Sequence, residues 1–216
     1  MSAKSLSYYS QPRTDLLALL PKHQHFNKSL DVGCGAGITS EYLKQHIGVT
    51  HTVGIEQQAE IAEQARTRLD AVYTLSAESD DLPFQPLDFD LLLFADILEH
   101  LIDPWRTLKK YLQFLKPGGL VLISVPNVQN WKMIFNLIRG RWNYSSSGLL
   151  DRDHLRFFTM KTARQMVHHA ELSVIKTRAT MGTEMKIING LTLGLCRRVL
   201  AYHLYLLAQK DENASE

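Results

Sequence analysis

Three glycines with a spacing suited to ligand binding, Gly33, Gly35 and Gly37, follow the strand-like run Ser29–Val32. Glycine adopts positive φ angles at little cost and lets a ligand approach the backbone closely. The amide groups at the start of a following helix can then reach that ligand. The turn therefore predicts a site for a nucleoside-like ligand, although a tight strand-to-helix turn can also occur without one.

A carboxylate at the end of the next strand-like run strengthens this prediction. Glu56 follows Val53–Ile55 and lies 19 residues beyond Gly37. At that distance a carboxylate can accept hydrogen bonds from both hydroxyls of a ribose. The glycine spacing is GxGxG, which differs from the GxGxxG of turns that hold the pyrophosphate of a dinucleotide. The two signals together favour a ribose-containing ligand without a pyrophosphate.

Asp96, Glu99 and His100 could act on a second substrate, because they lie within five residues of one another. Two carboxylates and an imidazole can move a proton or bind a divalent cation. The same residues can instead cap and pack a helix. We therefore assign no metal to them and keep Asp96 and His100 as candidate catalytic residues.

A second candidate group is the segment Asp151-Arg152-Asp153-His154-Leu155-Arg156. Histidine titrates near neutral pH, so His154 could accept the proton of a sugar or phenol hydroxyl. Asp153 would support it from the neighbouring position. The alternative is that His154 only anchors this segment by a hydrogen bond.

The elements that must position these residues alternate along the chain. Short apolar runs predict strands and amphipathic runs predict helices, and they alternate five times between Ser29 and Val125. This pattern is typical of a parallel sheet with helices on both faces. Pro117-Gly118-Gly119 is expected to separate a helix from the strand after it. The expected strands are 29–32, 51–55, 71–75, 89–94 and 120–125, and the expected helices are 38–46, 57–69 and 104–115.

The regions around this core are less regular. Residues 1–27 are expected to form a helical cap at the sheet edge, with residues 28–126 as the ligand-binding core. Residues 127–158 break the alternation and are interpreted as a lid. Its aromatic residues could stack on a sugar or an aromatic acceptor, or only pack the lid; they are Trp131, Trp142 and Tyr144. Residues 159–216 are expected to supply a helix at 162–170, a strand at 172–180 and a second apolar stretch that ends in residues 203–209.

Composition indicates one globular domain of 216 residues, of which 45% are hydrophobic and 21% charged. A net charge of +2 does not favour nucleic-acid binding. Cys34 and Cys196 form no CxxC pattern, and the polar N-terminus is unlike a secretory signal, so we expect a cytoplasmic protein. The apolar stretch from Ile187 to Ala208 contains charged residues, which favours a buried helix and strand over a membrane span.

Several motifs in this order resemble those of class I S-adenosylmethionine-dependent methyltransferases. They are VGCGAG, the GIE strand end, AESDDLPF, FDLLLFADILEHLIDP and LKPGG. The resemblance implies an α/β Rossmann-like fold with a seven-stranded, mostly parallel sheet, helices on both faces and a lid insertion after strand five. The flanking segments YYSQPRTDLLALLP and LLDRDHLRFFT resemble small bacterial methyltransferases linked to surface-polysaccharide systems. The DILEH segment also resembles ubiquinone-pathway O-methyltransferases.

The same resemblance implies specific roles for cofactor-binding residues. The three glycines would line the methionine and ribose portions of S-adenosylmethionine, and Glu56 would hold the ribose hydroxyls. Glu78 stands where the family usually has an aspartate that binds the adenine amino group, so its arm is one methylene longer. The other implied cofactor-binding residues are Arg13, Asp31, Gln57, Ser79, Phe94, Ala95 and Asp96.

The resulting hypothesis is an enzyme that transfers a methyl group to a hydroxyl of a saccharide or another small molecule. S-adenosylhomocysteine would be the product, and His154, Asp153, Asp96 and His100 would serve the acceptor. An association with glycan-biosynthesis enzymes fits this hypothesis. The alternatives are a non-catalytic S-adenosylmethionine-binding partner of a glycan-modifying enzyme and a nicotinamide-dependent oxidoreductase.

Overall fold

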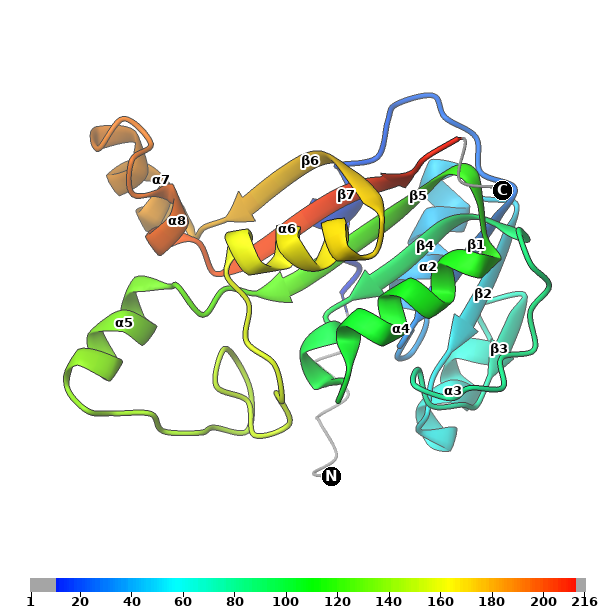
Figure 1. The fold of residues 1–216 in the computed structure, drawn as a ribbon, viewed down its shortest axis with the longest axis horizontal. Helices are drawn as coiled ribbons and strands as arrows, with labels where there is room; N and C mark the ends of the chain where they lie inside the picture. Colours follow the sequence, from blue (N-terminus) through cyan, green and yellow to red (C-terminus); the bar gives the residue numbers. More distant parts are fainter. Residues whose placement is uncertain (1–10, 213–216) are drawn as a thin grey trace.

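The computed structural model describes residues 11–212, whose strands form one sheet (Figure 1). The strand order is β3-β2-β1-β4-β5-β7-β6, and only β7 runs antiparallel to its neighbours. This confirms the predicted seven-stranded, mostly parallel sheet for the described part of the chain. The strands are β1 (Lys28–Val32), β2 (His51–Ile55), β3 (Ala71–Tyr73), β4 (Phe89–Ala95), β5 (Leu115–Pro126), β6 (Leu172–Thr180) and β7 (His203–Lys210).

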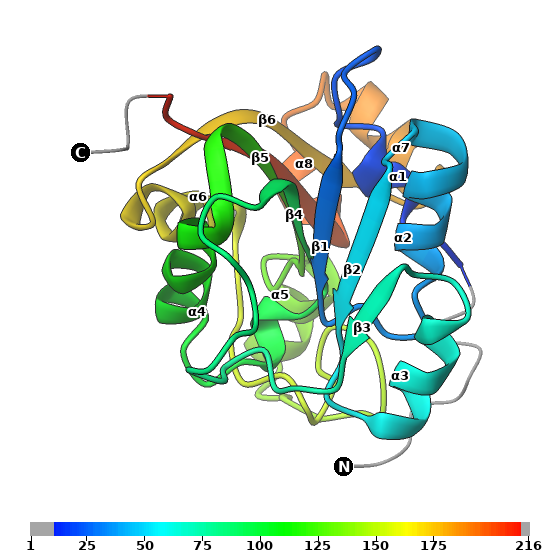
Figure 2. The same cartoon turned by 90° about the vertical axis from the view of Figure 1, so that its right-hand side faces the viewer.

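Helices cover both faces of the sheet, as expected. Figure 2 shows α1, α2 and α3 on one side of the sheet, and α4 and α6 on the other. The α-helices are α1 (Thr14–Leu17), α2 (Ile38–Tyr42), α3 (Ala59–Arg66), α4 (Pro104–Tyr111), α5 (Trp131–Ile138), α6 (Met160–His169), α7 (Thr183–Leu191) and α8 (Arg197–Leu200). A π-helical turn, η2 (Leu43–Ile47), continues α2, and two 3₁₀ turns are η3 (Leu98–His100) and η4 (Leu112–Phe114).

The alternation of side chains along β4 explains why this strand is an almost uninterrupted apolar run. Leu91 and Leu93 belong to the core cluster under α1, whereas Leu92 and Phe94 belong to the cluster under α4 and α6. All four side chains are fully buried. A central parallel strand needs apolar residues at every position because both of its faces are covered.

The N-terminal cap differs from the expectation. Among the described residues, its helix is the single turn α1, and residues 1–10 lie outside the described part. Leu16 and Leu17 pack among side chains of β4 and β5 on a face of the sheet, so the prediction that the cap sits at the sheet edge is wrong. The four buried leucines of LLALL explain this placement, because a sheet face offers more apolar area than an edge.

The expected boundary of the fifth strand was also wrong. Pro117, Gly118 and Gly119 lie inside β5, which begins at Leu115. The pairing with β4 shifts register between Phe89 and Leu91, next to this segment. Gly118 has a positive φ of 72°, so the strand tolerates the Pro-Gly-Gly sequence through a local irregularity.

Two segments leave the sheet at the carboxyl ends of β5 and β6. These two strands run in the same direction, so both segments lie at the same end of the sheet. Residues 127–158 include α5, and their two ends meet where the amide of Val128 donates to the carbonyl of Phe158 at 2.9 Å. Residues 181–202 include α7 and α8. The expectation that the start of the apolar stretch 187–208 is buried is wrong, because Leu191 and Leu193 are 81% and 91% exposed. The strand β7 that follows is buried, as expected. No helix in the described part is both long and apolar enough to span a bilayer.

A glycine in β2 tests how closely the first turn packs on the sheet. A Cβ atom on Gly54 would lie 2.6 Å from Sγ of Cys34 and 2.8 Å from Cδ2 of Leu69. Because this space is full, we expect Gly54→Ala to lower the free energy of unfolding by about 1–3 kcal/mol in chemical denaturation. Gly182→Ala is the matched control, since nothing lies within 4 Å of its new Cβ. Equal stability of the two variants would contradict the close packing.

Candidate functional site

A cavity of about 520 Å³ opens at the carboxyl ends of β1, β2 and β4. This is the edge of an open parallel sheet at which ligands bind. Arg152, Asp153 and Leu155, which come from a distant part of the sequence, also line it. The cavity brings together most of the residues predicted for the site: Arg13, Asp31, Gly33, Gly35, Glu56, Gln57, Glu78, Ala95, Asp96, His100 and Asp153.

Four predicted residues lie away from the cavity wall. Gly37 begins α2 with a φ of 81° and packs on Leu69. Phe94 is buried on the α4 side of the sheet. Ser79 hydrogen-bonds the carbonyl of Asp81. His154 is 6% exposed and stands behind the wall.

The turn after β1 is fixed to the end of β2. The carbonyl of Ile55 accepts hydrogen bonds from the amides of Gly33 at 2.8 Å and Cys34 at 2.9 Å. Gly33 and Gly35 have φ angles of 76° and 54°. A Cβ atom on Gly33 would lie 2.8 Å from the side chain of Ile97, so a larger residue fits neither the conformation nor the space.

Glu56 is held at the cavity by backbone amides. Its Oε2 accepts from the amide of Gly35 at 3.1 Å, and its Oε1 accepts from the amide of Gln58 at 2.8 Å. The residue is 7% exposed, and these two bonds fix the carboxylate in one orientation. Because each carboxylate oxygen can accept a second hydrogen bond, the group can still receive hydroxyl donors from a ligand.

Asp31 is a buried carboxylate beneath the glycine turn. Ser40 Oγ donates to its Oδ2 at 2.7 Å, whereas its buried Oδ1 has no hydrogen-bond donor among the described residues. Burial raises the pKa of Asp31 to about 6, the bond from Ser40 opposes this rise, and the negative charge of Glu56 adds to it. The carboxylate would therefore be stabilised by a ligand that brings a positive charge or a donor.

Asp96 follows β4 in the left-handed region, with a φ of 56°. Its Oδ1 accepts from Ser124 Oγ at 2.6 Å, and its Oδ2 lies 2.8 Å from the guanidinium of Arg13. The Nε2 atom of His203 lies 3.6 Å from Oδ1, and burial lowers the pKa of this histidine. Arg13 thus neutralises Asp96, a pairing that the sequence analysis did not foresee.

Glu78 also lines the cavity. Its carboxylate accepts hydrogen bonds from the amides of Ile102 at 3.2 Å and Asp103 at 2.8 Å. The longer glutamate arm therefore reaches the backbone before α4. This contact joins the segment after β3 to the segment after η3, and it keeps a carboxylate at the cavity wall.

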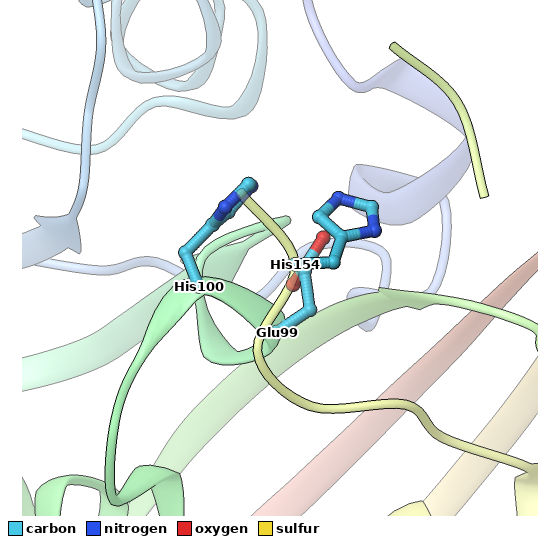
Figure 3. A group of neighbouring side chains, drawn as sticks. All are labelled: Glu99, His100 and His154. Atoms are coloured by element: carbon cyan, nitrogen blue, oxygen red, sulfur yellow. The ribbon is translucent and has the colours of Figure 1, made fainter. Parts of the chain in front are cut away.

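Glu99, His100 and His154 form a cluster of neighbouring side chains (Figure 3), of which His100 lines the cavity. The backbone carbonyl of Glu99 accepts from the amides of Leu155 at 2.8 Å and Arg156 at 3.0 Å, which joins segment 151–156 to η3. One ligand atom from each of the three side chains lies within 4.8 Å of the others. Two imidazoles and a carboxylate this close can share a proton or hold a divalent cation.

The two histidines of this cluster have different positions. His100 lines the cavity, and its Nδ1 lies 2.9 Å from the carbonyl oxygen of Asp153. Nδ1 of His154 lies 3.2 Å from the carbonyl oxygen of Leu149. Since a carbonyl only accepts, Nδ1 is the donor in each ring, and Nε2 is the acceptor when the ring is neutral. The rings meet edge to face at 4.7 Å.

The aromatic residues of segment 127–158 lie outside the main cavity. Trp142 packs edge to face on Phe157 at 5.4 Å, Trp131 lines a separate hollow, and Tyr144 is half exposed. Arg152 and Leu155 line the cavity instead, and neither was among the predicted site residues. Their proximity to an imidazole in the sequence was the signal that could have singled them out.

Acidic groups outnumber basic groups on the cavity wall. The acidic side chains are Asp31, Glu56, Glu78, Asp96 and Asp153, against Arg13 and Arg152. A nucleoside that carries an ammonium and a sulfonium group fits such a wall, because both charges are positive where the carboxylates are negative. The residues present therefore fit S-adenosylmethionine.

Comparisons with known proteins agree with this geometry. A family model described as a methyltransferase domain matches residues 7–177. Over 119 residues, the chain is 31% identical to a trans-aconitate 2-methyltransferase of Rhizobium etli, covering 55% of the chain and 45% of the relative. Over 103 residues, it is 34% identical to a ubiquinone biosynthesis O-methyltransferase of Xylella fastidiosa, covering 45% and 41%. The chain thus spans less than half the length of these relatives.

A solved structure shares the fold over most of both chains. The structure of a SAM-dependent methyltransferase from Archaeoglobus fulgidus has a TM-score of 0.68 and 17% identity, and it covers 91% of this chain and 92% of that one. The family match extends over the strands that build the cavity and includes its glycine turn. The chain belongs to the class I S-adenosylmethionine-dependent methyltransferase family.

Proposed function

We propose that this protein transfers a methyl group from S-adenosylmethionine to a hydroxyl of a saccharide or another small molecule. The observation that carries the proposal is one cavity that is lined both by the acidic side chains around the glycine turn and by His100. Its volume of about 520 Å³ is in the range of small-molecule sites. Two relatives are named for trans-aconitate and for ubiquinone biosynthesis, which supports a small acceptor.

When bound, S-adenosylmethionine supplies a methyl group on a positively charged sulfur. On the cofactor side, Glu56 would accept the ribose hydroxyls, because its orientation is already fixed by two amides. The glycine turn would leave room for the nucleoside, and Asp31 would face the cationic part of the ligand. Arg13 would donate to the carboxylate of the ligand through the N–H groups that its pairing with Asp96 leaves over.

On the acceptor side, the protein must align a hydroxyl and remove its proton. We assign the proton transfer to His100, since it lines the cavity and Asp153 orients its ring through a carbonyl. The proton of the hydroxyl would go to Nε2 of His100, because Nδ1 already donates to a carbonyl. The nearby carboxylate of Glu99 would stabilise the resulting imidazolium, and His154 becomes a positioning residue. We retain the proposal that residues 127–158 act as a lid, because Arg152, Asp153 and Leu155 of this segment line the cavity.

Cofactor binding can be tested by removing the ribose acceptor. Glu56→Ala should weaken S-adenosylhomocysteine binding about 100-fold, because two hydrogen bonds to a charged group are lost. Isothermal titration calorimetry measures the affinity, and Glu60→Ala on the exposed side of α3 is the matched control. Tight binding of NADH, with no binding of S-adenosylhomocysteine, would support the oxidoreductase alternative instead.

The raised pKa of Asp31 predicts that cofactor affinity depends on pH. Asp31 is protonated in part below about pH 6, and a cationic ligand favours its charged form. Binding of S-adenosylhomocysteine, which carries an ammonium group, should therefore release protons and strengthen as pH rises from 5 to about 7.5. Calorimetry in buffers of different ionisation enthalpy measures the released protons. Asp31→Asn should remove this dependence; a dependence unchanged in the variant would assign it to another group.

The same shift predicts the direction of a stability change. The folded-state pKa of Asp31 is above its usual value of 3.8, so folding favours the protonated form. The stabilisation of the folded state by protonated Asp31 is therefore fully present below about pH 4, and it is lost as pH rises through about 6. Asp31→Asn, which keeps an acceptor for Ser40, should raise the melting temperature of the ligand-free protein at pH 8 but not at pH 4. A decrease at pH 8 would show that the charge is needed for folding.

The acceptor base can be tested by His100→Ala. We expect turnover to fall at least about 100-fold, because general base catalysis is lost, with S-adenosylhomocysteine affinity within about threefold of wild type. The assay follows labelled methyl transfer to the best acceptor among glycans, lipid-linked sugars and quinol precursors. His168→Ala, on the exposed side of α6, is the control.

Two outcomes would contradict the role of His100. Unchanged turnover in His100→Ala would show that another group removes the proton. Loss of wild-type turnover in a chelator, restored by Mn²⁺ or Mg²⁺, would identify the cluster of Glu99, His100 and His154 as a metal centre instead. If none of the acceptors is methylated although S-adenosylhomocysteine still binds, the result favours the non-catalytic alternative.

A further inference from the structure

Two helical segments expose large apolar side chains that the proposed reaction does not use. On α5, Leu137 and Ile138 are 58% and 78% exposed. On the α7–α8 segment, Leu191, Leu193 and Leu195 are 81%, 91% and 86% exposed. Single exposed leucines are common, but several exposed apolar side chains within a few residues of one another indicate an interaction surface.

These two segments lie at the same end of the molecule. Strands β5 and β6 are both antiparallel to β7, so α5 and α7 leave the sheet beyond the same edge (Figure 1). Residues at the start of α5, including Trp131, line one hollow together with Thr183 and Met185 at the start of α7. The side chain of Asn130 also donates to the carbonyl of Ala201 at 2.9 Å, which ties the two segments together.

The charged side chains around these apolar groups are mostly basic. No Asp or Glu occurs between residues 127 and 150, and Glu184 is the one acidic residue between residues 181 and 210. The remainder of the chain carries a net negative charge, since the whole chain has only +2. The exposed basic residues beside the apolar groups are Lys132, Arg139, Arg141, Lys186, Arg197 and Arg198.

We propose that α5 and the α7–α8 segment form a surface that docks on a membrane with anionic headgroups. Apolar side chains flanked by lysine and arginine are the composition of helices that lie in the interface of a bilayer. The leucines enter the boundary of the acyl region, and the basic groups contact the anionic headgroups. The surface is peripheral, and it stands independently of the methyl acceptor.

The test is co-sedimentation of the full chain with vesicles of phosphatidylcholine, with and without phosphatidylglycerol. We expect binding to the anionic vesicles that weakens as salt is added. Arg197→Gln combined with Arg198→Gln should weaken this binding at least about tenfold, because each basic group contributes separately near the surface. Two further variants place charges in the apolar layer: the double variant Leu193→Asp and Leu195→Asp, and the single variant Ile138→Asp. Each should also weaken binding relative to wild type.

Ile175→Asp is the matched control, because Ile175 is 44% exposed on the edge strand β6, outside both segments. It should bind anionic vesicles as wild type does. All substituted side chains are exposed, and unchanged melting temperatures confirm that the variants fold. Wild-type protein that sediments with neither kind of vesicle overturns the proposal. So does a wild-type dimer that the leucine variants dissociate without any change in vesicle binding, because the apolar groups then bind a second copy.

Discussion

The architecture of the site depends on how one carbonyl group is shared. The carbonyl oxygen of Ile55, at the end of β2, accepts the amides of Gly33 and Cys34. This pair of hydrogen bonds presses the first turn onto the neighbouring strand, and the missing side chain of Gly54 provides the space. Glu56 follows Ile55 directly, so the same contact brings a ribose-type acceptor to the amide of Gly35.

The charges of the cavity are compensated to different degrees. Glu56 and Glu78 each accept two backbone amides, and Asp96 has both Arg13 and Ser124 as partners. Asp31 is different, because Ser40 contacts only one of its oxygens and burial raises its pKa. A cationic ligand would therefore gain the strongest electrostatic stabilisation beside Asp31, at the glycine turn. The glycine turn and the electrostatics of the site thus favour the same position for the ligand.

Much of the fold could be predicted because local sequence and tertiary structure agree. Strand β6 has the expected bounds, 172–180, and β4 differs from its expected range by one residue. The N-terminal cap and the start of β5 could not be placed, since the face chosen by LLALL and the tolerance of Pro117 depend on distant strands. The exposure of Leu191 and Leu193 was equally hidden, because an apolar helix shows the same pattern whether it is buried or exposed.

The site was predicted best where its residues are local in sequence. The glycines and Glu56 belong to one strand–helix–strand unit, and their spacing alone constrains their positions. The relative positions of His100 and His154 depend on hydrogen bonds from Leu155 and Arg156 to Glu99, which cross more than fifty residues of chain. The sequence brought both histidines forward as candidates, and only the tertiary contacts show which one lines the cavity.

The meeting of the two ends of segment 127–158 has a thermodynamic consequence. The hydrogen bond between Val128 and Phe158 closes the base of the segment, and Asn127 adds a side-chain bond of 2.9 Å to Ala201. The loss of chain entropy that comes with joining these ends therefore occurs during folding, before any ligand binds. A substrate that later orders the interior of the segment has to offset only the conformational freedom of that interior. If residues 127–158 act as the proposed lid, ordering its interior therefore needs no new closure of the segment at the sheet.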